Sequence, residues 1–376
     1  MNKIDLNNKT ILVTGSAGFI GSNLVKRLFK EMTEGVIVGL DNLNDYYDPR
    51  LKEYRLKELE SLHNSQFSII NYQFVKGSIS DRNLVNKLFE EYKFDIVVNL
   101  AAQAGVRYSI ENPDVYIESN IIGFYNILEA CRHSMPVQEF KGSRVQGEYR
   151  GVQHLVYASS SSVYGGNKKV PFSTDDRVDN PVSLYAATKK SNELMAHCYS
   201  KLYNIPSTGL RFFTVYGPAG RPDMAYFGFT NKLLKGDTIQ IYNYGNCRRD
   251  FTYVDDIVEG IWRVMQKSPA SPQPSPEGKG EVVPYAVYNI GGGQPENLLD
   301  FVQILQEELL RAGVLPKDYD FDAHKQLVPM QPGDVPTTYA DSTALQRDFG
   351  FTPKITLREG LRKFAEWYAE YYDIKR

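Results

Sequence analysis

The sequence has few residues that could form cross-links or hold a metal ion. Of its 376 residues, three are cysteine and five are histidine. Cys131, Cys198 and Cys247 lie far apart, with no Cys-x-x-Cys pair, and no His-Glu-x-x-His is present. This spacing favours neither a disulfide framework nor a zinc site. We therefore expect reduced thiols and no metal.

Long apolar runs and an excess of either charge are also missing. No run approaches the ~18 apolar residues of a membrane span, and the first ten residues are too polar for a signal peptide. The 43 basic and 45 acidic residues leave a net charge of −2, so no overall field attracts nucleic acid or an anionic membrane. The sequence predicts a cytoplasmic protein that binds neither.

Short β-branched runs alternate with amphipathic segments through the first 210 residues. The expected strands are Thr10–Thr14, Val36–Leu40, Tyr72–Lys76, Asp95–Leu100, His154–Ser159 and Pro206–Arg211. Helices are expected after Gly18, Asp81, Asp114 and Ser183, where apolar residues recur every three to four positions. This alternation predicts an α/β fold with a doubly wound, parallel Rossmann-type sheet.

Beyond residue 215 the alternation becomes irregular, and proline and glycine are frequent. We expect residues 1–215 to form the first domain and residues 216–376 mainly a smaller, irregular α/β lobe. The strand-like segment Tyr288–Ile290 is compatible with a return to the first sheet. Residues 135–151 and Ser268–Gly280 are expected to be surface insertions.

A glycine-rich segment, Thr14–Gly21, follows the first strand directly and opens a helix. Gly15 permits a tight turn, Gly18 lets the backbone approach a diphosphate, and Gly21 lets helix and strand pack closely. The amides at the helix start would face the phosphates. The glycines alone are also compatible with an ordinary strand–helix turn.

An acidic residue at the end of the second expected strand supports a dinucleotide-binding site. Asp41 stands twenty residues after Gly21, where a carboxylate can bind both ribose hydroxyls of an adenosine and would repel a 2′-phosphate. The first domain is therefore predicted to bind NAD in preference to NADP.

The pair Tyr185 and Lys189 is the best candidate for acid–base chemistry. The two residues lie four apart, on one face of an expected helix, and a nearby ammonium lowers the pKa of a phenol. The same spacing occurs at Tyr72, Tyr164 and Tyr371. Tyr72 lies in an expected strand, Tyr164 precedes two glycines, and Tyr371 lies at the end of the chain, so context selects Tyr185.

Four consecutive serines, Ser159–Ser162, follow the fifth expected strand. Alone they are compatible with a plain polar loop. At the carboxyl end of a parallel strand, where doubly wound folds bind ligands, they become candidate hydrogen-bond donors to a sugar.

Five ordered motifs together resemble the extended short-chain dehydrogenase/reductase superfamily over nearly the whole chain. They are the glycine pattern, Leu100-Ala101-Ala102, Val163-Tyr164-Gly165, Tyr185 to Lys189, and Tyr216-Gly217-Pro218. The resemblance implies that Ser160 is the catalytic hydroxyl, Tyr185 the base, and Lys189 its partner, which also holds the nicotinamide ribose.

The resemblance further implies a homodimer formed by the helices near Asp114 and Ser183. The implied cofactor contacts, besides the glycines, Asp41, Tyr185 and Lys189, are Phe19, Ile20, Asn42, Ser78, Ile79, Leu100, Ala101, Ala102 and Asn120.

Within the superfamily, the residues after Ser160 separate the possible reactions. Sugar-nucleotide 4,6-dehydratases carry an Asp-Glu pair there and the matching decarboxylases a glutamate, whereas this chain has Ser161 and Ser162. Its segments Asp41–Tyr47, Arg211–Pro218 and Gly220–Ala225 closely resemble those of UDP-glucuronate 4-epimerases. The resemblance implies substrate contacts from Arg107, Ser161, Ser162, Thr214, Arg221, Arg249 and Asp334.

Three positions depart from related families. Ser78 stands where many relatives have an aspartate that binds adenine, Thr214 where UDP-galactose 4-epimerases usually have asparagine, and Gln331 where those enzymes have an arginine. Two alternatives stay open: a UDP-hexose 4-epimerase, and a catalytically inactive binding protein built on the same fold.

Overall fold

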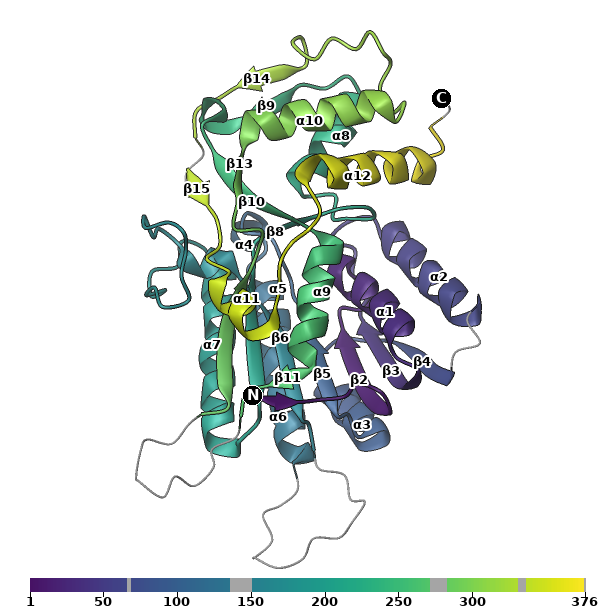
Figure 1. Ribbon diagram of the computed structural model, residues 1–376, viewed down its shortest axis with the longest axis vertical. Helices are drawn as coiled ribbons and strands as arrows, with labels where there is room; N and C mark the ends of the chain where they lie inside the picture. The colour runs from purple at the N-terminus through teal and green to yellow at the C-terminus, as the bar shows by residue number, and fades with distance from the viewer. Residues whose placement is uncertain (66–68, 136–150, 271–282, 331–335, 375–376) are drawn as a thin grey trace, which may run out of the picture.

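The computed structural model describes residues 1–65, 69–135, 151–270, 283–330 and 336–374. Its centre is a seven-stranded sheet in the order β12-β7-β6-β5-β2-β3-β4, with every pairing parallel (Figure 1). These strands are Lys9–Thr14 (β2), Glu34–Asp41 (β3), Ile69–Lys76 (β4), Ile96–Asn99 (β5), His154–Ser160 (β6), Ser207–Phe212 (β7) and Tyr285–Ile290 (β12). The chain order runs outward in both directions from β2 and β5. This pair is therefore the switch point at which doubly wound sheets bind ligands.

Apolar residues on both faces of the sheet account for its two helical layers. Along β2, Ile11 and Val13 pack into one core and Leu12 into the other, because successive side chains of a strand point to opposite faces. The first core takes in helices α1 (Phe19–Glu31), α2 (Arg50–Ser65) and α9 (Val254–Met265); the second takes in α3 (Arg82–Tyr92), α6 (Phe124–Ser134) and α7 (Leu184–Tyr203). The predicted doubly wound sheet is confirmed.

A smaller lobe, at the top of Figure 1, is built from residues after 213. Its strands are Thr214–Tyr216 (β8), Ile239–Ile241 (β9), Arg248–Tyr253 (β10), Pro295–Asn297 (β13), Lys325–Leu327 (β14) and Thr337–Thr338 (β15), and its helices are Ala225–Leu234 (α8), Leu298–Arg311 (α10) and Leu357–Tyr371 (α12). Strand β10 pairs with β8, β13 and β15, and β9 pairs with β14. The chain returns to the first sheet in β12, which includes the Tyr288–Ile290 segment, and α9 packs on α1.

The remaining elements are short. They are β1 (Asn2–Lys3), which pairs with β11 (Lys267–Ser268), helices α4 (Tyr108–Glu111), α5 (Asp114–Tyr116) and α11 (Thr343–Phe349), the π-helix η1 (Ile117–Gly123), and the 3-10 turns η2 (Ser161–Tyr164) and η3 (Tyr242–Gly245). Residues 136–150 and 271–282, which make up most of the two expected insertions, lie outside the described residues. Their surface position stays a prediction, as does a domain boundary at 215.

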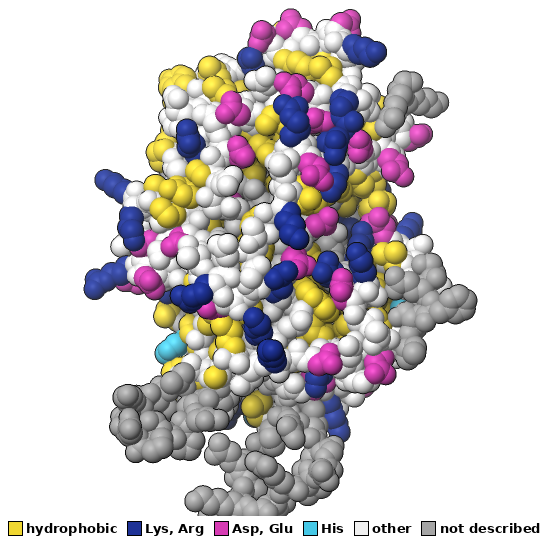
Figure 2. Space-filling view, in the orientation of Figure 1, with side chains coloured by type: hydrophobic (Ala, Val, Ile, Leu, Met, Phe, Trp, Pro, Cys, Tyr) yellow, Lys and Arg dark blue, Asp and Glu magenta, His cyan; other side chains and the backbone are white. Residues whose placement is uncertain are grey.

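The distribution of charged side chains on the surface agrees with the near-zero net charge. Basic and acidic side chains are interspersed over the face drawn in Figure 2. Among the described helices, none is both long enough and apolar enough to span a bilayer.

Candidate active site

The glycine loop between β2 and α1 is closely packed against neighbouring backbone. Gly15 has φ +68°, and a Cβ on it would lie 2.9 Å from the Ala101 nitrogen. A Cβ on Gly18 would lie 2.9 Å from the Gly15 carbonyl oxygen, and one on Gly21 only 2.1 Å from it. No side chain caps the start of α1. Its first amides are therefore available to an anionic ligand.

Asp41, at the end of β3, is buried beside this loop. One of its carboxylate oxygens accepts a hydrogen bond from the Ala17 amide at 3.1 Å, and the other accepts one from the Leu43 amide at 2.9 Å. The carboxylate therefore ties the glycine loop to the segment after β3, in the position predicted for a ribose contact.

One cavity joins the predicted cofactor and catalytic residues. It is lined by Gly15, Gly18, Phe19, Ile20, Gly21, Asp41, Asn42, Ser78, Ile79, Leu100, Ala101, Ala102, Ser160, Tyr185, Lys189 and Arg221, among others. Sequence reasoning missed four lining residues from the segment after β3: Asn44, Tyr46, Tyr47 and Lys52. For Asn44, Tyr46 and Tyr47 the available signal was the run of polar and aromatic residues directly after Asp41, at the ligand-binding edge of the sheet, whereas Lys52 lies in α2 and had no such signal.

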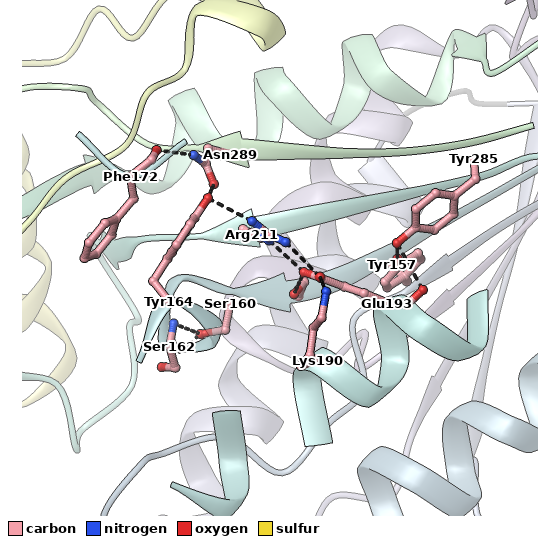
Figure 3. A network of polar contacts seen from close by, with 11 residues as sticks. Tyr157, Ser160, Ser162, Tyr164, Phe172, Lys190, Glu193, Arg211, Tyr285 and Asn289 are labelled. Carbon is pink, nitrogen blue, oxygen red and sulfur yellow. Dashed lines mark hydrogen bonds and ion pairs between the residues drawn. The ribbon is translucent and has the colours of Figure 1, made fainter. Parts of the chain in front are cut away.

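Tyr185 and Lys189 lie near the start of α7, opposite the end of β6. Ser183 fixes the helix start by accepting a hydrogen bond from the Ala186 amide at 3.1 Å. The hydroxyls of Tyr185 and Ser160 are hydrogen-bonded, and Ser160 Oγ also accepts a hydrogen bond from the Ser162 amide at 3.1 Å (Figure 3). The lysine Nζ donates to the Ala158 carbonyl at 2.9 Å. The helix start and the strand end thus place all three predicted catalytic groups together.

Burial has the largest effect on the pKa values of this pair. It lowers the pKa of Lys189 to about 8. It raises the pKa of Tyr185, while the hydrogen bond to Ser160 and the charge of Arg221 act in the opposite direction. The net shift in the pKa of Tyr185 is therefore upward, opposite to the direction expected from the sequence, because desolvation of the phenol outweighs the groups that favour the phenolate, and Lys189 is not among its main influences.

A buried ion pair behind the site joins α7 to the sheet (Figure 3). Arg211 of β7 donates two hydrogen bonds to the Glu193 carboxylate, at 2.8 and 2.9 Å, and one to the Tyr164 hydroxyl at 3.0 Å. Ser159 donates to Glu193 at 2.7 Å, and Tyr164 donates to Asn289 at 2.7 Å. Removing one member of a buried, hydrogen-bonded ion pair is strongly destabilising. The network therefore fixes the strand end that carries Ser160 relative to the helix that carries Tyr185.

Asn120 lies in the π-helix η1 and does not line the cavity. Its Oδ1 accepts a hydrogen bond from the Gln103 amide at 2.8 Å, and its Nδ2 donates to Gln103 O and Thr188 Oγ1, each at 3.0 Å. Its structural effect is to join the loop after β5 to α7.

The predicted substrate residues are less closely gathered. Arg221 lines the cavity, and its Nε and Nη2 bind the Asp223 carboxylate at 3.0 and 2.5 Å. Ser161, Ser162, Thr214, Arg107 and Arg249 do not line this cavity. Asp334 lies outside the described residues.

Of the two remaining arginines, Arg107 precedes α4 and contacts the smaller lobe, and Arg249 lies in β10 of that lobe. The guanidinium carbon of Arg107 lies 5.6 Å from the centre of the Tyr242 ring. Arg249 Nη1 donates to the carbonyls of Arg248 and Pro336, each at 3.0 Å.

The glycine loop, the acidic end of β3 and the Ser-Tyr-Lys group define the class as an NAD-binding enzyme of the doubly wound type. The family model for the NAD dependent epimerase/dehydratase family matches residues 11–291, and the chain belongs to that family. NAD is its cofactor.

Named relatives cover almost the whole chain. Protein CapI of Staphylococcus aureus is 50% identical, over 96% of this chain and 99% of its own length. UDP-glucuronate 4-epimerase 4 of Arabidopsis thaliana is 45% identical, over 97% of this chain and 76% of its own. The crystal structure of UDP-glucuronic acid 4-epimerase from Bacillus cereus, in complex with UDP-glucuronic acid and NAD, is 30% identical with a TM-score of 0.77, and covers 96% of this chain and 100% of that one.

Proposed function

We propose that this protein converts UDP-glucuronate to UDP-galacturonate by NAD-dependent 4-epimerisation. The observation that carries the proposal is that Arg221 lines the same cavity as Ser160, Tyr185 and Lys189. A guanidinium binds a carboxylate through charged, directional hydrogen bonds, and glucuronate differs from glucose in carrying that group. The named UDP-glucuronate 4-epimerases among the relatives support the same substrate.

In the proposed reaction, Tyr185 removes the proton of the C4 hydroxyl, with Ser160 hydrogen-bonded to the same oxygen. Bound NAD supplies reversible hydride transfer at C4. Lys189, buried under the strand end, holds the nicotinamide ribose. After the 4-keto sugar has turned over, hydride would return to the opposite face of C4, which inverts that carbon, and Tyr185 would return the proton to the C4 oxygen. Arg249 and Asp334 are proposed to hold the UDP while the sugar rotates.

A uronate epimerase must also keep its intermediate from losing carbon dioxide. After oxidation at C4, the carboxylate on C5 is β to a ketone and leaves most readily when its bond to C5 aligns with the carbonyl π system. We propose that Ser161, Ser162, Thr214 and Arg221 restrain it away from that alignment. The Arg221–Asp223 pair supports this role, because it fixes the Nε–Nη2 edge of the guanidinium at the wall of the cavity.

We also propose that the protein is a homodimer, that it works in the cytoplasm, and that it serves polysaccharide biosynthesis. The first rests on the exposed apolar residues of η1, α6 and α7. The cytoplasmic location rests on the lack of a long apolar run in the sequence, and the pathway rests on the resemblance to UDP-glucuronate 4-epimerases.

The decisive experiment is incubation of the purified protein with UDP-glucuronate, UDP-glucose and UDP-N-acetylglucosamine, followed by NMR of the products. We expect UDP-galacturonate from the first and little change in the other two. Epimerisation of an uncharged sugar alone would favour the UDP-hexose alternative. No turnover of any of the three would favour an inactive binding protein.

A further inference from the structure

Within the described residues, two buried cations stand beside the glycine loop, and one buried carboxylate, that of Asp41, lies near Lys52. Lys52, in the first turn of α2, is 5% exposed, and Arg55, one turn later, is fully buried. Lysine and arginine are almost never buried at this level without a partner. The nearby buried carboxylate is Asp41, and Asp45 contributes only from the exposed surface.

The ammonium of Lys52 faces the cofactor cavity. It donates to the carbonyl oxygen of Asn44 at 2.9 Å and to the side-chain oxygen of the same residue at 2.7 Å. Its distance to the Asp41 carboxylate is 4.0 Å, too long for a hydrogen bond. An ammonium has three N–H groups. One N–H therefore stays available to a ligand, and Lys52 lines the cavity together with Asn42 and Asn44.

Every hydrogen bond of Arg55 goes to a neutral oxygen. Its acceptors are the carbonyls of Ala17, Ala219 and Gly220 and the hydroxyl of Tyr47, at 2.7 to 3.1 Å. Ala17 belongs to the glycine loop itself. Arg55 thus places a full positive charge directly behind the loop, and no carboxylate within its hydrogen bonds balances it.

Lys52, Arg55 and Asp41 together leave one positive charge in excess at this end of the cavity. A buried charge without a counterion is costly, and an anion held beside it in a poorly solvated site is correspondingly stabilised. The first amides of α1 face the same region and also favour an anion. The 2′-phosphate of NADP is disfavoured as the anion, because the Asp41 carboxylate stands where the adenosine ribose is expected and would repel it.

We propose that Lys52 donates a hydrogen bond to the diphosphate of NAD, and that Arg55 adds its charge to that site from behind the glycine loop. Lys52 is thus a cofactor-binding residue, and Arg55 a positioning residue that holds the loop. The inference depends on NAD as the cofactor and not on the sugar that the enzyme uses.

Lys52→Met tests the proposal, because it removes the charge and keeps an unbranched side chain of similar length. We expect NAD and NADP affinity to fall by the same factor, about 10- to 100-fold, the usual effect of losing a charged hydrogen bond. Adenosine, which has no phosphate, should bind as it does to the parent. Affinities come from equilibrium dialysis of the purified full-length protein against radiolabelled NAD, with NADP and adenosine as competitors.

Lys26→Met is the matched control. Lys26 lies on α1, pairs with Glu58 at 2.7 Å and does not line the cavity, so its loss should leave NAD affinity within about two-fold. Lys52→Gln, which loses the charge but keeps a donor for Asn44, serves if the methionine variant does not fold, and it should weaken NAD similarly. Unchanged NAD affinity, or an equal loss for adenosine, overturns the proposal. Weaker NADP binding alone also overturns it, since Lys52 would then contact the 2′-phosphate.

Discussion

At the scale of single residues, the proposed base Tyr185 is harder to ionise because it is buried. Burial raises the pKa of Tyr185, and only the Ser160 hydrogen bond and the Arg221 charge oppose this effect among its main influences. A phenol in such a setting is a poor base until further positive charge arrives beside it. Oxidised nicotinamide carries that charge, so we infer that the base becomes competent when cofactor and substrate are both bound.

Tyr185→Phe should lower turnover of UDP-glucuronate by about 10²- to 10⁴-fold and leave UDP-sugar affinity nearly unchanged, because only the proton acceptor is lost. Tyr371→Phe, at another Tyr-x-x-x-Lys spacing, is the control and should keep parental turnover. Steady-state rates and calorimetric binding check both variants. Near-normal turnover of the Tyr185 variant would exclude this residue as the base.

Lys189 should make stability depend on pH. Burial lowers its pKa from 10.5 to about 8 in the folded protein, so between these values the unfolded chain binds one more proton and the free energy of unfolding rises with pH. Between pH 8 and about 9.5 the gain should reach about 2 kcal/mol relative to Lys189→Met, and below pH 8 the difference should be constant. Urea unfolding of both proteins, freed of NAD, measures this. Parallel stability curves across the range would contradict the lowered pKa.

Arg221→Ala tests whether Arg221 binds the carboxylate of the substrate. Loss of a charged hydrogen bond should weaken UDP-glucuronate binding by about 1.5–3 kcal/mol and affect UDP-glucose, which has no carboxylate, much less. The released carboxylate can also align with the C4 ketone, so some turnovers should give carbon dioxide and a UDP-4-keto-pentose. Calorimetry and product NMR report these outcomes. Parental binding and no pentose would remove Arg221 from the proposed site.

At the scale of elements, the sequence predicted those features that depend on a local pattern of residues. Periodicity and glycine spacing predicted the strands of the parallel sheet and the loop before α1, and context selected Tyr185 over three tyrosines with the same spacing. Lys52 could not be found this way, because it is one of several charged residues on an amphipathic helix and only tertiary packing buries it. The contact of Glu193 with Arg211 joins a helix to a strand, which no local pattern reveals.

Gly21→Ala should disrupt the junction of β2 and α1. The added Cβ would lie 2.1 Å from the Gly15 carbonyl oxygen, and its nearest neighbours are all backbone atoms of Gly15 and Ser16, so no flexible side chain can move aside. We expect a loss of stability of about 3 kcal/mol and weaker NAD binding, since α1 must shift away from the loop. Gly166→Ala is the control: nothing lies within 4 Å of its added Cβ, so stability should stay within about 0.5 kcal/mol. Thermal unfolding and NAD titration are applied to both variants. Equal losses of stability and NAD affinity would show that the close packing at Gly21 does not determine either property.

At the scale of the whole molecule, three neighbouring helical elements carry exposed apolar side chains. Exposed apolar side chains gather on η1, α6 and α7, which pack against one another. They are Ile117, Ile122 and Tyr125 on the first two, at 42%, 46% and 37% exposure, and Leu194 and Leu202 on α7, at 60% and 64%. Exposed apolar side chains on neighbouring helices are candidates for a protein–protein interface, and this supports the proposed homodimer. Because α7 also carries Tyr185 and Lys189, a contact here would rest directly on the helix that holds the catalytic pair.

We therefore expect the parent protein to sediment at twice its chain mass of 42.7 kDa, and Leu194→Glu to sediment as a monomer. A carboxylate placed within the core of an apolar interface loses its hydration without gaining a partner, which costs more than the leucine contact itself. Leu327→Glu is the matched control, because Leu327 is 47% exposed on β14 in the smaller lobe, away from this region, and this variant should remain dimeric. Sedimentation equilibrium, with circular dichroism to check folding, distinguishes the outcomes. A monomeric parent, or a folded Leu194 variant that still dimerises, would show that α7 does not form the interface.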